Sequence, residues 1–433
     1  MRHQATDLAI APHTPPPGAA PPGAVPARPG TAPGRDGPEE DGRAAPPGAD
    51  ADVAAAVDAV LGGHLARRLE QAEQISERFA ADVADCVVTL VRRGGKRLRP
   101  AFLWWGWRAA GGAPEGAGAG AVLRAAAALE LIQACALVHD DLMDGSPLRR
   151  GAPAAHVALA HRHRAARLHG DAEAFGASAA LLAGDLALVW AEDLWDAALP
   201  TEAARRRTRP VWRAMRTEMV AGQYLDLHGQ AARARSRDAA LHVAHLKSGL
   251  YTVERPLHLG AALADAPAAT TAALRRAGRR TGVAFQLRDD LLGVFGDPAR
   301  TGKPAGEDVR AGKPTYLMAV GLARARARGE RAAEERLTAA LGDRALGAAG
   351  LDRVRELLTG LGAREAVERH IAELTGSALA ALDEADLDPG AARRLAALVR
   401  GVLAGSEPAG RGTAHAPGVA GATDTARAAA GPV

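Results

Sequence analysis

Three aspartates near the middle of the chain, Asp140, Asp141 and Asp144, have the spacing of a metal site. They stand at the end of a long apolar stretch that predicts a helix, and side chains four residues apart share one face of a helix. Carboxylates this close repel one another unless a cation lies between them. Oxygen ligands suit Mg²⁺, which keeps several waters and takes its other ligands from the phosphates of a substrate.

Two arginines, Arg149 and Arg150, follow these aspartates in a turn rich in Gly, Ser and Pro. A guanidinium group can hold a phosphate through two parallel hydrogen bonds. Taken alone, Asp-Asp-x-x-Asp could be an acidic helix end exposed to solvent. The arginines at a fixed distance, together with a second acidic pair, favour a metal-bridged diphosphate site instead.

The second acidic pair, Asp289 and Asp290, also ends an apolar stretch with helical periodicity. Beyond it, a segment rich in Gly and Pro could fold over the site as a lid. This segment contains three charged residues, Lys303, Asp308 and Lys313. Two aspartate-bearing helix ends with several isolated basic groups are far more specific than either motif alone.

A basic turn, Arg92 to Pro100, precedes the helix expected to begin near Leu98. Its glycines allow a tight backbone turn, so Lys96 and Arg99 can reach one phosphate together. A basic loop that only aids solubility is the alternative.

Isolated polar residues in apolar stretches mark further candidates. Gln133 either hydrogen-bonds within the core or faces a ligand, because buried polar groups need partners. Gln223 and Asp226 are three residues apart and share a helix face. Lys247, followed by Ser248, is costly in an apolar stretch unless an anion lies beside it.

Histidines and cysteines offer no convincing nucleophile. We expect His139 to support the aspartates by hydrogen bonding, and His161–Arg164 to lie in a surface loop after Pro153. Cys86 and Cys135 stand in apolar helical stretches, which suits reduced, buried thiols in a cytoplasmic protein without disulfides.

Composition excludes several classes of protein. The net charge of the 433 residues is +4 and aromatic residues make up 3%, which argues against binding of nucleic acid. Residues 1–30 lack the apolar core of a signal peptide. The most apolar stretch, 121–138, is interrupted by Arg124, Glu130 and Gln133, so we expect a soluble protein without a membrane span.

The chain is predicted to hold one all-α domain, residues 51–405. Residues 1–50 and 406–433 are rich in Pro, Ala and Gly and should be disordered, because they cannot bury enough apolar surface. Helical periodicity dominates the domain. The expected helices are 51–77, 79–93, 98–110, 119–143, 176–198, 208–229, 237–263, 268–296, 314–341, 349–359 and 363–402.

Taken in order, these motifs resemble those of the trans-prenyltransferases, the isoprenyl diphosphate synthases of the polyprenyl synthetase family. The similarity runs from about 90 to 320 and includes Gly-Gly-Lys-Arg-x-Arg-Pro, Asp-Asp-x-x-Asp with Arg-Arg-Gly, Gly-Gln-x-x-Asp, Lys-Ser, Phe-Gln-x-x-Asp-Asp and Gly-Lys-Pro-Thr. The resemblance implies a helical bundle around a deep central cavity, usually a homodimer. It also implies two or three Mg²⁺ ions, and isopentenyl diphosphate and an allylic diphosphate (dimethylallyl, geranyl or farnesyl) as substrates.

The resemblance also assigns roles to residues. Metal binding on the allylic diphosphate falls to Asp140, Asp141 and Asp144 on one side and to Asp289 and Asp290 on the other. The departing diphosphate would be held by Arg149, Lys247, Lys303 and Lys313. Isopentenyl diphosphate would be held by Lys96, Arg99, Gln133 and Arg150. The carbocation region would be lined by Ser248, Gln223 and Gln286. One departure concerns Gly293, which stands where the second motif usually has its last aspartate.

Product length should depend on how far the cavity extends below Asp140. At 1.5 Å per residue, Ala136 lies about 6 Å and Ile132 about 12 Å down the same helix face. Cys135 and Ala136 are small and leave the first level open, whereas family members that stop chains early have a bulky aromatic residue there. Ile132 or a tryptophan (Trp104, Trp105, Trp107 or Trp190) could form a deeper floor. This favours a C20 product, geranylgeranyl diphosphate, over C15 farnesyl diphosphate.

Three alternatives stay open at this point. The product could be farnesyl or a longer polyprenyl diphosphate. A class I terpene cyclase would need an Asn/Ser/Glu metal triad in place of the second aspartate motif, and Asp289 and Asp290 argue against it. A non-catalytic synthase subunit usually loses one aspartate motif, whereas this chain lacks only the carboxylate at Gly293.

Overall fold

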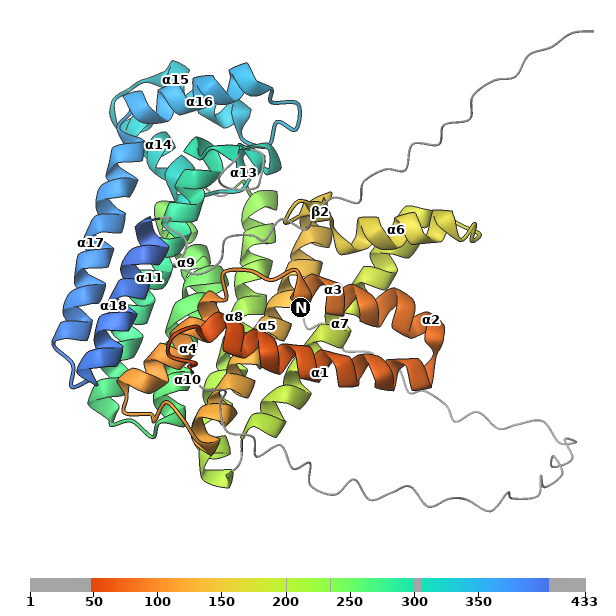
Figure 1. Cartoon of the computed structure of the whole chain (residues 1–433). Coiled ribbons are helices and arrows are strands. Elements are labelled where there is room, and N and C mark those ends of the chain that lie inside the picture. The colour runs from red at the N-terminus through yellow and green to blue at the C-terminus, as the bar shows by residue number, and fades with distance from the viewer. Residues whose placement is uncertain (1–47, 200, 234, 299–304, 405–433) are drawn as a thin grey trace, which may run out of the picture. The chain divides into compact units, whose positions relative to one another are not determined.

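A computed structural model describes residues 48–404, apart from 200, 234 and 299–304 (Figure 1). The predictions of disorder for 1–50 and 406–433 therefore fall almost wholly outside the described residues. The folded part begins slightly before the predicted boundary at 51, because Ala49 is buried and Asp50 accepts hydrogen bonds from Trp104 and Arg108. All described residues belong to one compact unit.

The described part is almost entirely helical, as predicted, with one short hairpin. The first half contains α1 (Val53–Ile75), α2 (Glu77–Phe79), the π-helix η1 (Ala80–Ala84), α3 (Asp85–Arg92), α4 (Leu98–Ala109), α5 (Ala117–Asp144), β1 (Leu148–Arg149), β2 (Ala152–Pro153), α6 (Ala155–Ala165) and α7 (Ala172–Ala198). The second half contains α8 (Glu202–Ala231), α9 (Arg237–Ala244), the π-helix η2 (His245–Glu254), α10 (Arg255–Leu263), α11 (Ala268–Phe295), α13 (Glu307–Ala311), α14 (Tyr316–Ala327), α15 (Arg331–Ala340), α16 (Ala348–Gly360), α17 (Ala363–Asp383) and α18 (Pro389–Ala404).

Helix α5 forms the centre of the bundle. It is rich in alanine and leucine, and most of its residues are buried. Helices α1, α3, α4, α6 and α7 all pack against it, and α7 runs along it over the greatest length. Because alanine side chains are small, neighbouring helices can approach α5 closely without leaving voids. Its last turn therefore stands at a fixed place among the helices around it.

Helix α11, which carries the second acidic motif, is joined to α8 through η2. Helix η2 packs on both α8 and α11. A Cβ atom on Gly282 of α11 would lie 2.4 Å from the carbonyl oxygen of Gly249, and one on Gly222 of α8 would lie 2.5 Å from the backbone nitrogen of Lys247. These glycines let three backbones come into direct contact, and this contact sets the position of Lys247.

Some helices differ from the prediction. Residues 155–165 form α6, so the loop expected at His161–Arg164 is wrong; three of these residues are exposed as expected, whereas His163 is buried. The expected helix 314–341 is two helices, because Gly329 adopts a left-handed φ of +70° after α14. The expected helix 363–402 is also two, since Asp388 caps the start of α18 with a hydrogen bond from the backbone nitrogen of Ala391.

Two helices in the described part, α5 and α7, are long and apolar enough to cross a membrane if only length and composition are considered. In α5, 78% of the most apolar window is buried inside the protein, and in α7 the share is 44%. The long apolar stretch of α5 is therefore accounted for by its place in the core, and the absence of a membrane span stays a prediction.

Candidate active site

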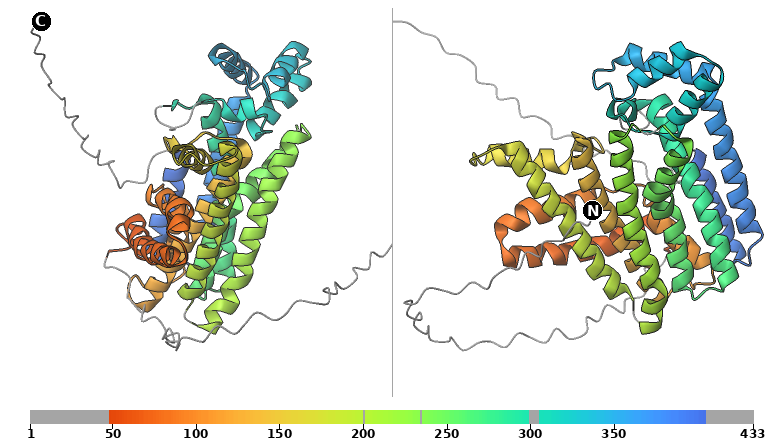
Figure 2. Two further views of the ribbon diagram at one scale, coloured as in Figure 1. Left: turned by 90° about the vertical axis from the view of Figure 1, so that its right-hand side faces the viewer. Right: turned by 180° about the vertical axis from the view of Figure 1, so that it is seen from behind.

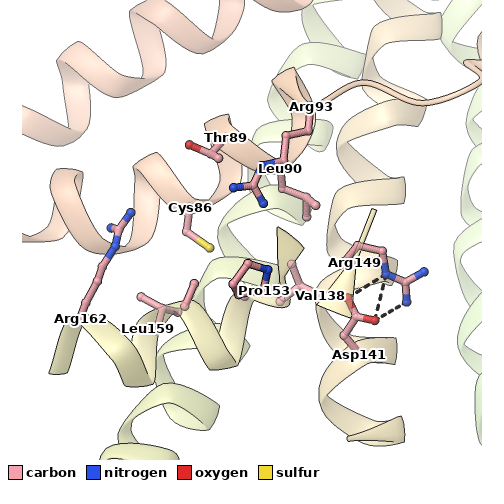
Figure 3. Close-up of a pocket in the computed structure, with 12 residues that line it drawn as sticks. Cys86, Thr89, Leu90, Arg93, Val138, Asp141, Arg149, Pro153, Leu159 and Arg162 are labelled. Atoms are coloured by element: carbon pink, nitrogen blue, oxygen red, sulfur yellow. Dashed lines mark hydrogen bonds and ion pairs between the residues drawn. The ribbon is translucent and has the colours of Figure 1, made fainter. Parts of the chain in front are cut away.

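The first acidic motif occupies the last turn of α5. Gly145 ends the helix in the left-handed conformation, with a φ of +64°. The hairpin β1–β2 then returns the chain towards the helix, so that Arg149 Nε lies 2.9 Å from both carboxylate oxygens of Asp141 (Figure 3). The same guanidinium lies 3.6 Å from Asp140. Arg149 thus balances the charge of two motif aspartates.

Lysine 247 links the first motif to α8. Its Nζ lies 3.1 Å from Asp140 Oδ1 and 2.7 Å from Asp226 Oδ2, and Gln223 donates a hydrogen bond of 3.0 Å to Asp140. The prediction that Lys247 needs an anion beside it is confirmed. Burial alone would raise the pKa of Asp140, but the neighbouring cations, Lys247 first among them, lower it below its usual value. Asp140 is therefore held as a carboxylate.

Lysine 313 joins the first motif to the segment that follows α11. Its Nζ lies 2.6 Å from Asp144 and 3.6 Å from Asp308. Burial disfavours its charge, but the carboxylates of Asp308 and Asp144 outweigh that effect and raise the pKa of Lys313 above its usual value. A permanent cation therefore lies between the two acidic sides of the site.

The second motif presents one exposed and one buried aspartate. Asp289 is exposed, whereas Asp290 is buried and accepts hydrogen bonds from Gln286 Nε2 at 2.8 Å and from the backbone nitrogen of Tyr316 at 3.3 Å. Burial, with smaller contributions from Asp308 and Asp289, raises the pKa of Asp290 to about 8. Gln223 and Gln286, predicted from the resemblance to line the carbocation region, each hold a motif aspartate.

Two residues predicted to hold isopentenyl diphosphate, Arg99 and Arg150, lie near each other, because the charge of Arg99 contributes to the lowered pKa of Arg150 after burial and other nearby charges. Arg99 on α4 lies 4.1 Å above the ring of Tyr251 and donates to Thr252 at 3.1 Å. Arg150 lies against Gly95, where a Cβ atom would be 2.8 Å from its guanidinium. Gln133 Oε1 and Arg99 Nε are both buried and make no hydrogen bond with any described residue. Unpaired buried groups of this kind fit a site that a ligand completes.

A buried charge network that was not predicted from the sequence holds the basic turn in place. Arg97 adopts a left-handed φ of 47° and is buried. Its guanidinium pairs with Glu130 on α5 and donates 2.9 Å hydrogen bonds to Asp58 on α1 and to the carbonyl of Val91 on α3, and so ties the turn to three helices. Glu130 is an acidic residue in an apolar stretch, and this could have suggested a buried cationic partner such as Arg97.

Other candidates lie as follows. Lys96 is exposed on the basic turn, Ser248 lies half-buried in η2, and Lys303 lies outside the described residues. His139 contacts α7 rather than the motif carboxylates, because its Nε2 lies 3.3 Å from the carbonyl of Leu181. Both cysteines are free thiols, as predicted, but only Cys135 is buried, whereas Cys86 is half-buried. Burial raises the pKa of Cys135 to about 12, so it stays protonated.

One side of α5 carries the half-buried residues that precede the first motif. Gln133, Ala136, Leu137 and Asp140 are half-buried and share one helix face, whereas Ile132, one turn before Ala136 in the chain, is fully buried. Cys135 is buried on another face, with its sulfur 3.8 Å from His139. Of the residues predicted to control product length, Ala136 is thus the half-buried one, whereas Cys135 and Ile132 are buried.

A separate small cavity of about 70 Å³ lies next to the pair of Asp141 and Arg149 (Figure 3). Apolar side chains of α3, α5 and α6 line most of it, including Leu90, Val138 and Leu159. It therefore lies alongside the first motif and is walled mainly by the core.

The donor set fits Mg²⁺ bound together with a diphosphate. Within the described residues no three His, Cys, Asp or Glu side chains converge on one point that could hold a metal by themselves. Mg²⁺ sites need no such cluster, because one or two carboxylates, several waters and substrate phosphates complete the octahedron. The motif aspartates supply only oxygen ligands, and the cations beside them could pair with the phosphates.

Comparisons with known proteins agree with this geometry. A family model described as polyprenyl synthetase matches residues 81–350. The structure of geranylgeranyl pyrophosphate synthase from Corynebacterium glutamicum, complexed with isoprenyl diphosphate and magnesium, is 42% identical with a TM-score of 0.74, over 80% of this chain and 98% of that one.

Two curated relatives are similar over shorter stretches. Geranylfarnesyl diphosphate synthase of Aeropyrum pernix is 33% identical over 229 residues, which are 53% of this chain and 67% of that protein. The (2E,6E)-farnesyl diphosphate synthase of Mycobacterium tuberculosis is 37% identical over 240 residues, 55% of this chain and 60% of that protein. The predicted isoprenoid-synthase bundle is confirmed by these matches, and the chain belongs to the polyprenyl synthetase family of prenyltransferases.

Proposed function

We propose that this protein extends an allylic diphosphate with isopentenyl diphosphate, releasing diphosphate, and that its final product is geranylgeranyl diphosphate. One observation carries the proposal: Lys313 lies within 2.6 Å of Asp144 on α5 and within 3.6 Å of Asp308 beyond α11. A carboxylate of the first motif and one from the segment beyond the second motif therefore share one cation, which supports a diphosphate held by metals between the two motifs.

The allylic diphosphate would lie between the two acidic sides. When the bond from its first carbon to oxygen breaks, the diphosphate keeps the electron pair and gains negative charge. Arg149, Lys247 and Lys313 already converge on this region through the motif aspartates. Cations held in position before the reaction stabilise the developing charge without reorganising, which is a large contribution to such catalysis.

The second substrate would be held by the basic turn and its neighbours. Arg99 and Arg150 lie near the buried pair of Arg97 and Glu130, and Gln133 on α5 would act with them. They would orient isopentenyl diphosphate so that its double bond attacks the allylic carbon. The electrons of that double bond form the new carbon–carbon bond, and a proton then passes to the departed diphosphate.

The metal sites would be formed by Asp140, Asp141 and Asp144 on one side and by Asp289 and Asp290 on the other. Two or three Mg²⁺ ions, when bound, would supply positive charge to the leaving diphosphate. Asp141 and Asp144 are now paired with Arg149 and Lys313. These side chains would exchange carboxylate partners for phosphate partners as the substrate enters.

The proposed C20 product rests on the cavity side of α5. Ala136 is half-buried one turn before Asp140 on α5 and presents only a methyl group. Ile132 is the next side chain on that face. Trp190 is buried on α7, which packs along α5, and could close the cavity with Ile132. Relatives with C15, C20 and C25 products in their names match this chain, so the proposal on length stands on these residues.

We also propose that the enzyme is a cytoplasmic homodimer. Phe175, Leu182 and Val189 recur every seven residues on α7 and are exposed, and Val220 and Tyr224 are exposed on α8. Both helices lie at the surface turned towards the viewer in the rear view (Figure 2). A second copy of this face would cover these side chains, and the free cysteines suit a reducing compartment.

Product analysis by mass spectrometry tests the proposed function. Purified protein would receive Mg²⁺, isopentenyl diphosphate and, in separate reactions, dimethylallyl, geranyl or farnesyl diphosphate, with Asp140→Ala as the inactive control. A C20 diphosphate is expected. A C15 product or one longer than C20 would keep the chemistry and overturn the proposed length. Release of a hydrocarbon would point to a terpene cyclase, and no product at all to a non-catalytic subunit.

A further inference from the structure

Arg97 has a strained backbone in the middle of the basic turn. Its φ of 47° lies in the left-handed region, which is uncommon for residues other than glycine. Such residues persist only where the surrounding structure holds them, and they occur preferentially at functional sites. The side chain of Arg97 supplies this hold, since only 5% of it is exposed.

The guanidinium group of Arg97 is bound by acceptors on three helices. It pairs with Glu130 on α5 and donates hydrogen bonds of 2.9 Å to Asp58 on α1 and to the carbonyl of Val91 on α3. The pair of Arg97 and Glu130 is almost fully buried, whereas Asp58 is partly exposed. Separating a buried ion pair leaves uncompensated charge in the core, which is strongly unfavourable. The pair therefore fixes the turn relative to α5.

The residues around Arg97 are those assigned to isopentenyl diphosphate. Lys96 directly precedes it, and Arg99 follows two residues later in the first turn of α4. Arg150 packs against the same turn from the β1–β2 hairpin, because a Cβ atom on Gly95 would lie 2.8 Å from its Nη2. Arg97 thus fixes the backbone from which two candidate phosphate ligands project and against which a third packs.

The charges near this turn favour an anion. Burial lowers the pKa of Arg150, and the charge of Glu130 opposes this effect. The cations of Arg97 and Arg99 lie close enough to lower the pKa of Arg150 further. Three guanidinium groups therefore lie around one buried carboxylate, which leaves positive charge available to an anion such as a diphosphate.

We propose that the buried pair of Arg97 and Glu130 positions the binding site of isopentenyl diphosphate without contacting this substrate. The inference rests on the proposed function, because it concerns the second substrate of the same reaction. The effect should be selective, since the allylic diphosphate would lie at the acidic motifs of α5 and α11. A pair that only stabilised the fold would affect both substrates alike.

The experiment compares the Michaelis constants for the two substrates in three variants that keep the predicted ligands of both. Arg97→Met/Glu130→Leu replaces the buried ion pair by apolar side chains, a change that often leaves stability unaltered. Arg97→Lys keeps the charge but cannot reproduce the forked hydrogen bonds. Arg92→Met is the matched control, because Arg92 is an exposed arginine that ends α3 just before the turn.

Farnesyl diphosphate serves as the allylic substrate, because one extension takes it to C20. In the double variant we expect KM for isopentenyl diphosphate to rise about ten- to a hundredfold, the effect of a misplaced binding group. KM for farnesyl diphosphate should stay unchanged. Arg97→Lys should give a smaller rise, and Arg92→Met should match the unmodified protein. Tm reports the stability of each variant, and calorimetric titration with isopentenyl diphosphate without Mg²⁺ reports binding directly.

Two results would overturn the assignment: a double variant that binds isopentenyl diphosphate as tightly as Arg92→Met, or an equal rise of both Michaelis constants. If the double variant does not fold, an unchanged KM for isopentenyl diphosphate in Arg97→Lys overturns it equally. Any of these results in an enzyme that still elongates prenyl chains leaves the proposed function intact. An unmodified protein that forms no product would instead overturn the proposed elongation, and calorimetry on the same variants would still decide the role of Arg97.

Discussion

Two aspartates that carry the same role by resemblance, Asp140 and Asp290, have opposite electrostatic surroundings. Asp140 is surrounded by Lys247, Lys313 and Arg149, which outweigh burial and lower its pKa. Asp290 has neutral hydrogen-bond partners, and burial raises its pKa to about 8. At neutral pH and without metal, Asp140 is therefore ionised while Asp290 is mostly protonated.

This difference predicts a pH dependence of stability. Because the folded pKa of Asp290, about 8, exceeds the unfolded value near 3.9, the folded protein binds the proton more tightly. The stabilisation that protonated Asp290 gives the folded state is complete below about pH 4 and is lost as the pH rises through about 8. The Tm of the metal-free protein should therefore fall relative to that of Asp290→Asn between pH 5 and 9.

The measurement is thermal unfolding of both proteins across that range without Mg²⁺. The difference between the two curves isolates Asp290 from the other titrating groups. Parallel curves would show that Asp290 titrates as an ordinary exposed carboxyl and would contradict the stated pKa.

Sequence reasoning located the charged residues of the site but not their partners. The motif aspartates, Lys247 and Lys313 stand where expected because their spacing on helix ends is fixed by helix geometry. The pairing of Arg97 with Glu130 spans 33 residues, and that of Lys247 with Asp140 spans 107. Such contacts between distant segments leave no periodic pattern in the sequence.

At the scale of elements, close backbone contacts position the site. Helix η2 carries Lys247 and meets α8 at Gly222, where a Cβ atom would lie 2.5 Å from a backbone nitrogen. π-helical segments occur often at functional sites. Apolar periodicity predicted one continuous helix over 237–263. The change from α-helix to π-helix within it depends on packing between distant segments, which periodicity does not reveal.

Replacing Gly222 by alanine should test this contact. The added methyl has no flexible side chain to displace, so the two helices must separate, at a cost of about 1–3 kcal/mol as for other overpacked sites. Activity should fall as well, because Lys247 moves away from Asp140. Gly376→Ala is the control. A Cβ atom added to Gly376 on α17 would meet no other part of the described structure within 4 Å, and the variant should gain slightly in helix stability.

Denaturant unfolding of both variants gives the free energy of unfolding directly. A Gly222→Ala protein as stable as the Gly376→Ala protein would show that α8 and η2 can move apart freely.

Product length tests the role assigned to α5. Ala136→Phe would place an aromatic ring on the half-buried face of α5, one turn before Asp140. The main product should then shorten from C20 to C15 or C10. Ala136→Gly keeps the space open and should leave the product unchanged. Mass spectrometry of the diphosphates reports the outcome, and an unshortened product in Ala136→Phe would place the floor on another helix.

Element boundaries were predictable where apolar periodicity was long and uninterrupted. Helix α5 was expected over 119–143 and spans Ala117–Asp144, and α11 was expected over 268–296 and spans Ala268–Phe295. Helix α6 was missed because its run of histidine and arginine resembles a polar loop. Helix α13 is short and lies among glycines, so its five residues gave no periodic signal.

For the whole molecule, the apolar stripe on α7 is the feature that a single chain leaves unexplained. Phe175, Leu182 and Val189 are exposed at seven-residue spacing. If this face meets a second copy, Leu182→Glu/Val189→Glu should shift the mass in solution from two chains to one. Light scattering coupled to size exclusion measures it, with Glu173→Gln, an exposed charge change on the same helix, as the control. A dimer that persists in the double variant would place the interface elsewhere.

The lysine between the two acidic sides has a consequence for how ligands enter. Lys247 and Lys313 already neutralise the aspartates that Mg²⁺ would need, and the same aspartates occupy the cations that a diphosphate would need. Either ligand arriving alone must break ion pairs without replacing them. Arriving together, each releases the partners that the other requires. Mg²⁺ and diphosphate should therefore bind with positive thermodynamic coupling, and by reciprocity each should raise the affinity of the other by the same factor.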